Sequence, residues 1–123
     1  MKHASILALS AALGLAAPGL ALAATCDRPS PPVSVDGSKA TLDELKAAKT
    51  AVTTFMTASD AYQGCVLDDL AAQKAAATAA KTKLDPAVAK AAEQKVNDNQ
   101  ADKERVGSDF NAAVKAFRTA HPS

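Results

Sequence analysis

The chain has 123 residues, a formal net charge of +1, 48% hydrophobic residues and only 3% aromatic residues. This length suits one small domain, and the near balance of charge lacks the basic excess that is typical of a nucleic-acid-binding protein. Trp is absent and Phe is rare, so the core must be assembled largely from Leu, Val and Ala and will be thin.

Residues 1–23 have the three parts of a secretory signal peptide. Lys2 supplies a basic start, an apolar stretch follows, and Ala-Leu-Ala at 21–23 forms a small-x-small cleavage site. We expect cleavage after Ala23, which leaves 13 basic and 13 acidic residues, no stable membrane span and a periplasmic or secreted protein. The alternative is a retained membrane anchor, which the Pro18-Gly19 break disfavours.

Both cysteines, Cys26 and Cys65, follow the predicted signal peptide. An even number of cysteines in an oxidising compartment predicts an intrachain disulfide, and closing a loop of about 40 residues stabilises a fold by about 4 kcal/mol. The alternatives are a disulfide between two chains, a reactive thiol, and lipidation of Cys26. Thr25 is unfavourable for lipidation, and a reactive thiol usually needs a nearby base, whereas His121 is the one histidine after the signal.

Residues 24–41 are predicted to form an extended, Pro-rich strap. Three prolines at positions 29–32 oppose helix and favour polyproline geometry, and Asp36-Gly37 predicts a turn. The roughly 15 residues that follow Cys26 can cover about 47 Å as polyproline. The strap is therefore long enough to fold back along a helix and bring its cysteine to the other one.

A first long helix is predicted from about Leu42 to about Lys83. Thr41 and Glu44 form a T-x-x-E capping box, which marks its start. Small or apolar residues then recur in steps of three and four, the period of a helix. Gly64 is the one weak point, with a cost of about 1 kcal/mol or a slight kink.

A second long helix is predicted from about Pro86 to about Thr119. Asp85 is a strong N-cap and Pro86 suits the first helical position, while Pro122 follows the predicted end. Apolar residues again recur in steps of three and four.

The predicted fold class is all-α: an antiparallel, coiled-coil-like hairpin over residues 42–120, with the strap held to it by one disulfide. Two long helices joined by a very short turn must lie antiparallel. A turn at residues 84–85 would place Leu70 opposite Asn99, so a polar side chain is expected in the middle of the seam, where it helps to define the register.

A spaced set of residues runs through most of the chain after the signal. Its members are Cys26-x-x-Pro29, Val35-Asp36-Gly37, Glu44, Tyr62-x-x-Cys65 and Phe110-Asn111-x-x-Val114-x-x-Phe117. This set resembles a family of small, uncharacterised exported (periplasmic) proteobacterial proteins, of which the Tyr-x-x-Cys spacing is the more specific part. The segment at 34–36 departs from the family pattern, which has a proline before Asp-Gly. The resemblance implies export and this fold, and it implies no activity.

We expect neither a catalytic site nor a cofactor or metal site, so the protein is predicted not to be an enzyme. One histidine after the predicted signal and two paired cysteines leave no ligand set for zinc or copper. A Ser-His-Asp set and a glycine-rich phosphate loop are both missing from the sequence. The acidic residues are more simply a solvated helix face than a calcium site. They are Asp68, Asp69, Asp98 and Asp102.

The predicted function is therefore non-catalytic: an envelope protein that acts through protein–protein contact, with an unknown protein or a second copy of itself as partner, and without nucleic acid. The alternative is a small-molecule binding module with a groove between strap and hairpin. Tyr62, Val66 and Val106 are the candidate ligand or partner contacts in that groove, although a core role is the simpler interpretation of Tyr62.

Overall fold

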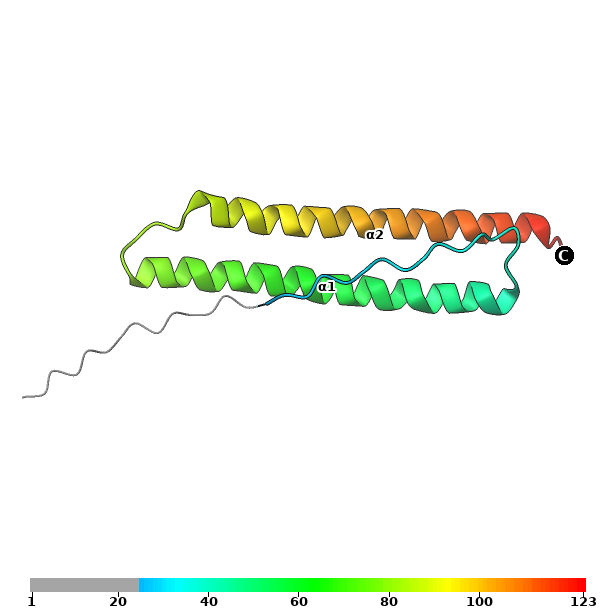
Figure 1. The fold of residues 1–123 in the computed structure, drawn as a ribbon, viewed down its shortest axis with the longest axis horizontal. Helices are drawn as coiled ribbons and strands as arrows, with labels where there is room; N and C mark the ends of the chain where they lie inside the picture. The colour runs from blue at the N-terminus through cyan, green and yellow to red at the C-terminus, as the bar shows by residue number, and fades with distance from the viewer. Residues whose placement is uncertain (1–24) are drawn as a thin grey trace, which may run out of the picture.

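The computed structural model describes residues 25–123, so the predicted signal peptide at 1–23 lies outside the described residues. Two helices, α1 (Leu42–Ala79) and α2 (Pro86–Ala120), lie side by side and antiparallel (Figure 1). No strand occurs within the described range. The prediction of an all-α helical hairpin is confirmed.

Both helices start where local side-chain chemistry requires it. The Glu44 N–H donates to Thr41 Oγ1 at 3.2 Å, and the Thr41 N–H donates to the Glu44 carboxylate at 2.7 Å. Asp85 accepts from the Ala87 N–H at 2.9 Å, and Pro86 occupies the first turn of α2. These bonds satisfy N–H groups that have no partner inside the helix, so the two predicted starts are confirmed.

The end of α1 differs from the prediction. The helix ends at Ala79, four residues short of the expected end. Lys81 adopts a left-handed conformation with φ 55°; its N–H donates to the Thr78 carbonyl at 3.0 Å, and the Thr82 N–H donates to the Ala77 carbonyl at 2.9 Å. This bonding pattern is a Schellman cap, which usually carries glycine at the left-handed position. A lysine at this position does not indicate a helix end in the sequence as a glycine would, so the predicted end was wrong.

The register between the helices also differs from the prediction. Asn99 Nδ2 donates to Ser59 Oγ at 3.2 Å and Asn99 Oδ1 accepts from Gln63 Nε2 at 3.0 Å, so Asn99 does not lie opposite Leu70. Figure 1 shows the reason: α1 reaches further toward the turn than the start of α2, and residues 80–85 span this offset. A two-residue turn with level helix ends was the wrong assumption.

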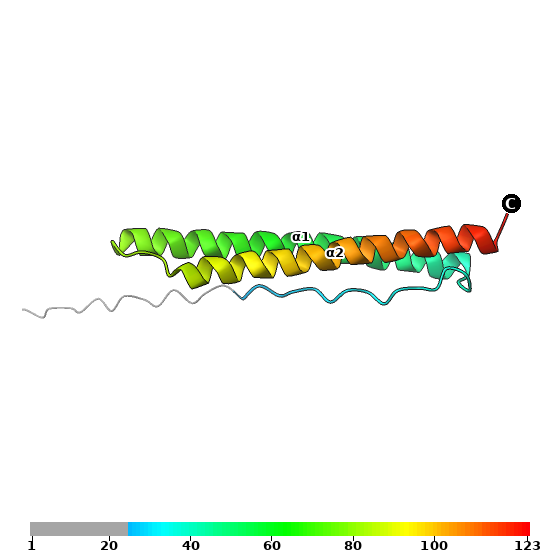
Figure 2. The ribbon, with the colours of Figure 1, turned by 90° about the horizontal axis from the view of Figure 1, so that it is seen from above.

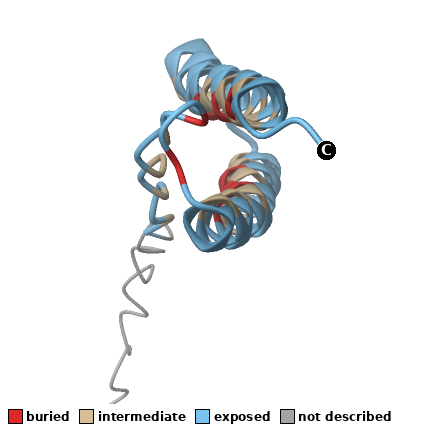
Figure 3. Ribbon diagram, turned by 90° about the vertical axis from the view of Figure 1, so that its right-hand side faces the viewer, coloured by how far each residue is buried: buried red, intermediate tan, exposed pale blue. Residues whose placement is uncertain are grey.

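The strap folds back along the hairpin. Residues 25–36 are extended and run alongside both helices (Figures 1 and 2). Seen end on, the strap lies on one side of the helix pair, and buried residues face the space between the three segments (Figure 3). Cys26 and Cys65 are disulfide-bonded, with their Cα atoms 5.8 Å apart. The predicted disulfide-held strap is confirmed.

The core is thin, as the composition predicted. Its buried hydrophobic residues are Ala40, Phe55, Tyr62, Val66, Ala92, Val106 and Ala113. The only side chains that reach complete burial within the described range are polar: Ser59 and Asn99, both 0% exposed. Because they bond to each other, their burial carries no unsatisfied polar group at this level of the seam.

The strap backbone lies close against α2 at Gly37. A Cβ atom at this residue would lie 1.8 Å from the Ala113 carbonyl oxygen, so no side chain fits there. Gly37 belongs to a turn over residues 36–40 that Asp36 stabilises. The Asp36 carbonyl accepts from the Ala40 N–H at 3.0 Å, and its carboxylate accepts from the Ser38 N–H at 3.0 Å. The turn therefore presses the strap backbone directly onto α2.

Gly37→Ala should lower the free energy of unfolding by about 1–3 kcal/mol, because the added carbon must displace either the strap or α2. Gly64→Ala is the matched control: nothing lies within 4 Å of its Cβ position, and alanine should stabilise the interior of α1 by about 1 kcal/mol. Urea unfolding of the oxidised protein measures both. Equal changes in the two variants would contradict the close contact at Gly37.

Candidate functional site

The structure places the three predicted contact residues in the interior. Tyr62, Val66 and Val106 are 6%, 5% and 4% exposed. Tyr62 and Val66 pack with Ala92 in one cluster, and Cys26 of the strap packs against that cluster. All three therefore belong to the core of this structure.

The space between strap and hairpin is divided into two unequal cavities. The one at Val106 holds about 20 Å³, too little for an organic ligand. The other holds about 260 Å³ and lies between the two helices beside the disulfide. It is lined by Cys26, Val66, Asp69, Leu70, Gln73, Val88, Ala91, Ala92 and Lys95. Of the three predicted contact residues, only Val66 lines this larger cavity.

Charged side chains fasten the strap to α2. Arg28 donates to the Asp102 carboxylate at 2.7 Å, and Arg105 donates to the same carboxylate at 3.3 Å. The hydrogen bond from Arg28 lowers the pKa of Asp102 below its usual value and outweighs the opposing effect of desolvation. Further along, Ser34 Oγ donates to the Asp109 carboxylate at 3.2 Å. All of these contacts are exposed, so each adds little to stability.

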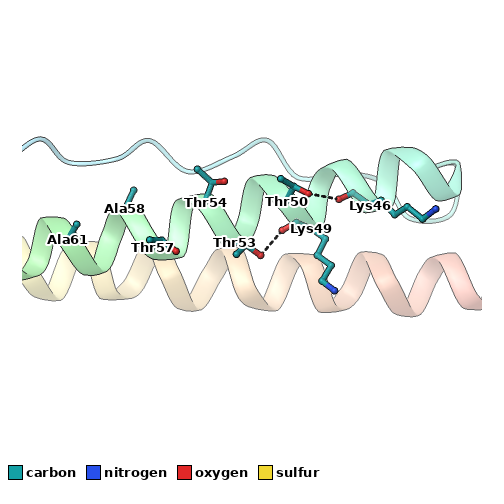
Figure 4. A pocket seen from close by; sticks show the side chains of 8 residues that line it. All are labelled: Lys46, Lys49, Thr50, Thr53, Thr54, Thr57, Ala58 and Ala61. Carbon is teal, nitrogen blue, oxygen red and sulfur yellow. Dashed lines mark hydrogen bonds between the residues drawn. The ribbon is translucent and has the colours of Figure 1, made fainter.

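A second surface, which we name the outward face of α1, lies on the side of that helix away from its buried residues. Figure 4 shows the side chains of this open surface, which all come from α1. Its residues are Lys46, Lys49, Thr50, Thr53, Thr54, Thr57, Ala58 and Ala61. Since all of them belong to one helix, the face cannot enclose a small molecule, but it can lie against another elongated surface.

The outward face of α1 is formed mostly by short side chains, and two of its hydroxyl groups have hydrogen-bond partners within the helix. Thr50 Oγ1 donates to the Lys46 carbonyl at 3.2 Å, and Thr53 Oγ1 donates to the Lys49 carbonyl at 3.0 Å (Figure 4). These hydroxyls are satisfied within the helix, so covering them would leave no unpaired donor. Lys46 and Lys49 have the long side chains on this face, and its other side chains are those of threonine and alanine.

Sequence reasoning followed the apolar residues of α1 and missed this face. A signal was present in the small residues, which recur at intervals of seven. They are Thr50, Thr57, Gly64 and Ala71, all exposed. A seven-residue period places such residues along one side of a helix, as in helix pairs that pack against each other.

Neither described helix combines the length and apolar character needed to cross a membrane. Within residues 25–123, no three side chains of His, Cys, Asp or Glu converge in a way that could hold a metal ion. Comparisons with protein-family models, curated proteins and solved structures found no match to this chain. The functional argument therefore depends on the surfaces described above.

Replacing Cys26 and Cys65 together by alanine should lower the free energy of unfolding by about 4 kcal/mol, because the unfolded chain regains the freedom of a loop of about 40 residues. Urea unfolding followed by the fluorescence of Tyr62, the single tyrosine in a chain without tryptophan, measures the loss. A dithiol should destabilise the wild type similarly and leave the double variant unchanged. An unchanged wild-type midpoint in the dithiol would contradict the stabilising role of the disulfide.

Acid should weaken the fastening of the strap. The folded-state pKa of Asp102 is lowered, so its contribution to stability is present above the unfolded value of about 3.9 and is lost as pH falls through the folded value. Asp102→Asn should therefore unfold at lower urea than the wild type at about pH 6, and the difference should shrink below about pH 4.

Two other carboxyl groups also have lowered pKa values, and both are present in the wild type and in Asp102→Asn. The pKa of Asp36 is lowered chiefly by the Ser38 hydroxyl and that of Glu44 by the Thr41 N–H, so both proteins should lose stability in acid. Only the difference between wild type and Asp102→Asn reports on Asp102, whose carboxylate accepts from Arg28 of the strap and from Arg105 of α2. A difference that stays constant from about pH 6 to about pH 2 would contradict the role of Asp102.

Proposed function

We propose that this chain is a non-catalytic periplasmic or otherwise exported envelope protein that acts through protein–protein contact. One observation carries the proposal: the outward face of α1 bears mostly short side chains, two of whose hydroxyls, those of Thr50 and Thr53, donate within the helix, and it lies opposite the buried side of the helix. Helix α2 and the strap pack against the opposite side of α1, so the face is presented on a preorganised helix.

The shape of this face favours a macromolecular partner. Small-molecule sites bury most of their ligand in a concave pocket, whereas this surface is one open side of a helix. A partner helix or strand offers a complement of comparable length, and short side chains let its backbone approach closely. The two lysines, Lys46 and Lys49, lie toward one end and would favour acidic groups on the partner there.

Three observations support an exported location. Residues 1–23 have the pattern of a signal peptide, and residues after 25 resemble a family of exported proteins. The disulfide between Cys26 and Cys65 is compatible with a periplasmic or extracellular compartment, where such bonds persist.

A small-molecule binding module is the second candidate, because of the cavity of about 260 Å³ beside the disulfide. Its walls combine apolar Val66 and Leu70 with polar Gln73 and Lys95, so an amphiphilic ligand would suit it. Ala91→Phe, at the exposed wall of this cavity, should abolish binding of such a ligand and leave contacts of the outward face of α1 intact.

Photo-crosslinking in cells that export the protein tests the first candidate. A photoreactive residue at position 57, on the outward face of α1, should give adducts, whereas the same residue at position 101, exposed on α2, should give none or far fewer. Adducts of equal yield at both positions, or none at either, would reject protein contact through this face.

A further inference from the structure

The side of α1 that bears the outward face continues past Ala61 to Asp68, and it carries opposite charges toward its two ends. Lys46 and Asp68 are both exposed and are 22 residues apart, close to six helical turns of about 3.6 residues, so they lie on the same side of the helix. Among residues 25–123, the ion pair of Lys46 is with Asp43, at 3.6 Å, and both side chains are exposed to solvent. Such an exposed pair is weak and leaves Lys46 available to a stronger partner.

This pattern is complementary to itself. Lys46 and Asp68 are each eleven residues from Thr57, and Thr50 and Gly64 are each seven residues from it. When two copies of α1 cross antiparallel with Thr57 on the two-fold axis, residues at equal distances from Thr57 face each other. Lys46 of each copy then meets Asp68 of the other, and Thr50 meets Gly64.

We propose that a second copy of this chain docks on the outward face of α1 in this antiparallel register; the inference rests on the proposed function and names its partner. A two-fold contact of this kind uses the same patch on both copies and closes on itself. The two Lys46–Asp68 pairs fix direction and register, and the short side chains between them allow the helices to approach.

Two observations select this arrangement over others. A parallel pairing would set Lys46 against Lys46 and Asp68 against Asp68, and such like-charge contacts are strongly unfavourable. Gly64 lies in the interior of α1, where glycine is unfavourable, yet nothing within the chain lies within 4 Å of its missing Cβ. Thr50 of the second copy would occupy the space that this glycine leaves open.

The dimer should be weak and sensitive to salt. The contact extends over one side of α1 for about 35 Å, which places it at the small end of specific interfaces. Charge pairs at an exposed rim contribute orientation and are screened by added salt. We expect association in the range of about 10 µM to about 1 mM, depending on salt.

Sedimentation equilibrium of the oxidised mature protein, from about 5 µM to about 1 mM, tests the proposal. Lys46→Asp and Asp68→Lys should each weaken association at least about tenfold, because each sets like charges against each other twice. The double variant Lys46→Asp/Asp68→Lys re-forms both pairs with reversed sign and should return to within about threefold of the wild type. Lys90→Asp, a reversal at an exposed residue of α2, should leave association unchanged.

A wild type that stays monomeric at about 1 mM, or a double variant that fails to recover, overturns the proposal. Circular dichroism of each variant shows whether the hairpin is intact, and the double variant keeps the test decisive if one single variant unfolds. The crosslinker at position 57 separates the two levels of the argument. Adducts with a different protein, together with a monomeric chain, would reject self-docking and leave protein contact standing; absence of both would reject both.

Discussion

A covalent bond between the strap and α1 is the constraint on which this structure depends. Ordering each strap residue costs about 1–2 kcal/mol. The polar contacts that offset this cost, Arg28 with Asp102 and Ser34 with Asp109, are exposed and weak, and the close backbone contact at Gly37 lies at the far end of the strap from Cys26. Without the bond between Cys26 and Cys65, these contacts alone would have to hold the strap against the hairpin. With it, the strap is fixed at both ends, by the turn at residues 36–40 and by the disulfide.

The position of the disulfide matters as much as its presence. Where Ser59 and Asn99 are fully buried, a hydrogen bond helps to define the register of the two helices, but these polar residues bury less apolar surface. The strap packs against the neighbouring cluster of Tyr62, Val66 and Ala92 through Cys26, and so adds a third wall to the two that the helices provide. One side of α1 is thereby committed to the fold. The opposite side, with its short side chains and spaced charges, lies away from the core and is open to solvent.

Much of this architecture could be predicted from the sequence because local chemistry determines it. The Thr41–Glu44 capping box and Asp85-Pro86 determine the helix starts, and the strap's proline content and length bring its cysteine to Cys65. The end of α1 could not be predicted, because a lysine occupies a left-handed position that glycine usually marks. The register failed with it, since the longer connection and the bonds of Asn99 shift the pairing. The groove expected around Tyr62 and Val106 depended on side-chain packing, which periodicity alone does not resolve.

Hydrogen–deuterium exchange of the oxidised and reduced mature protein, resolved by residue, tests the central claim most directly. If the disulfide holds the strap as the third wall of the seam, reduction should speed amide exchange first around Tyr62–Val66 in α1 and around Ala92–Asn99 in α2, while the helix starts at Leu42 and Pro86 change little. Exchange rates that are the same in both redox states, or that rise equally along both helices, would contradict the claim.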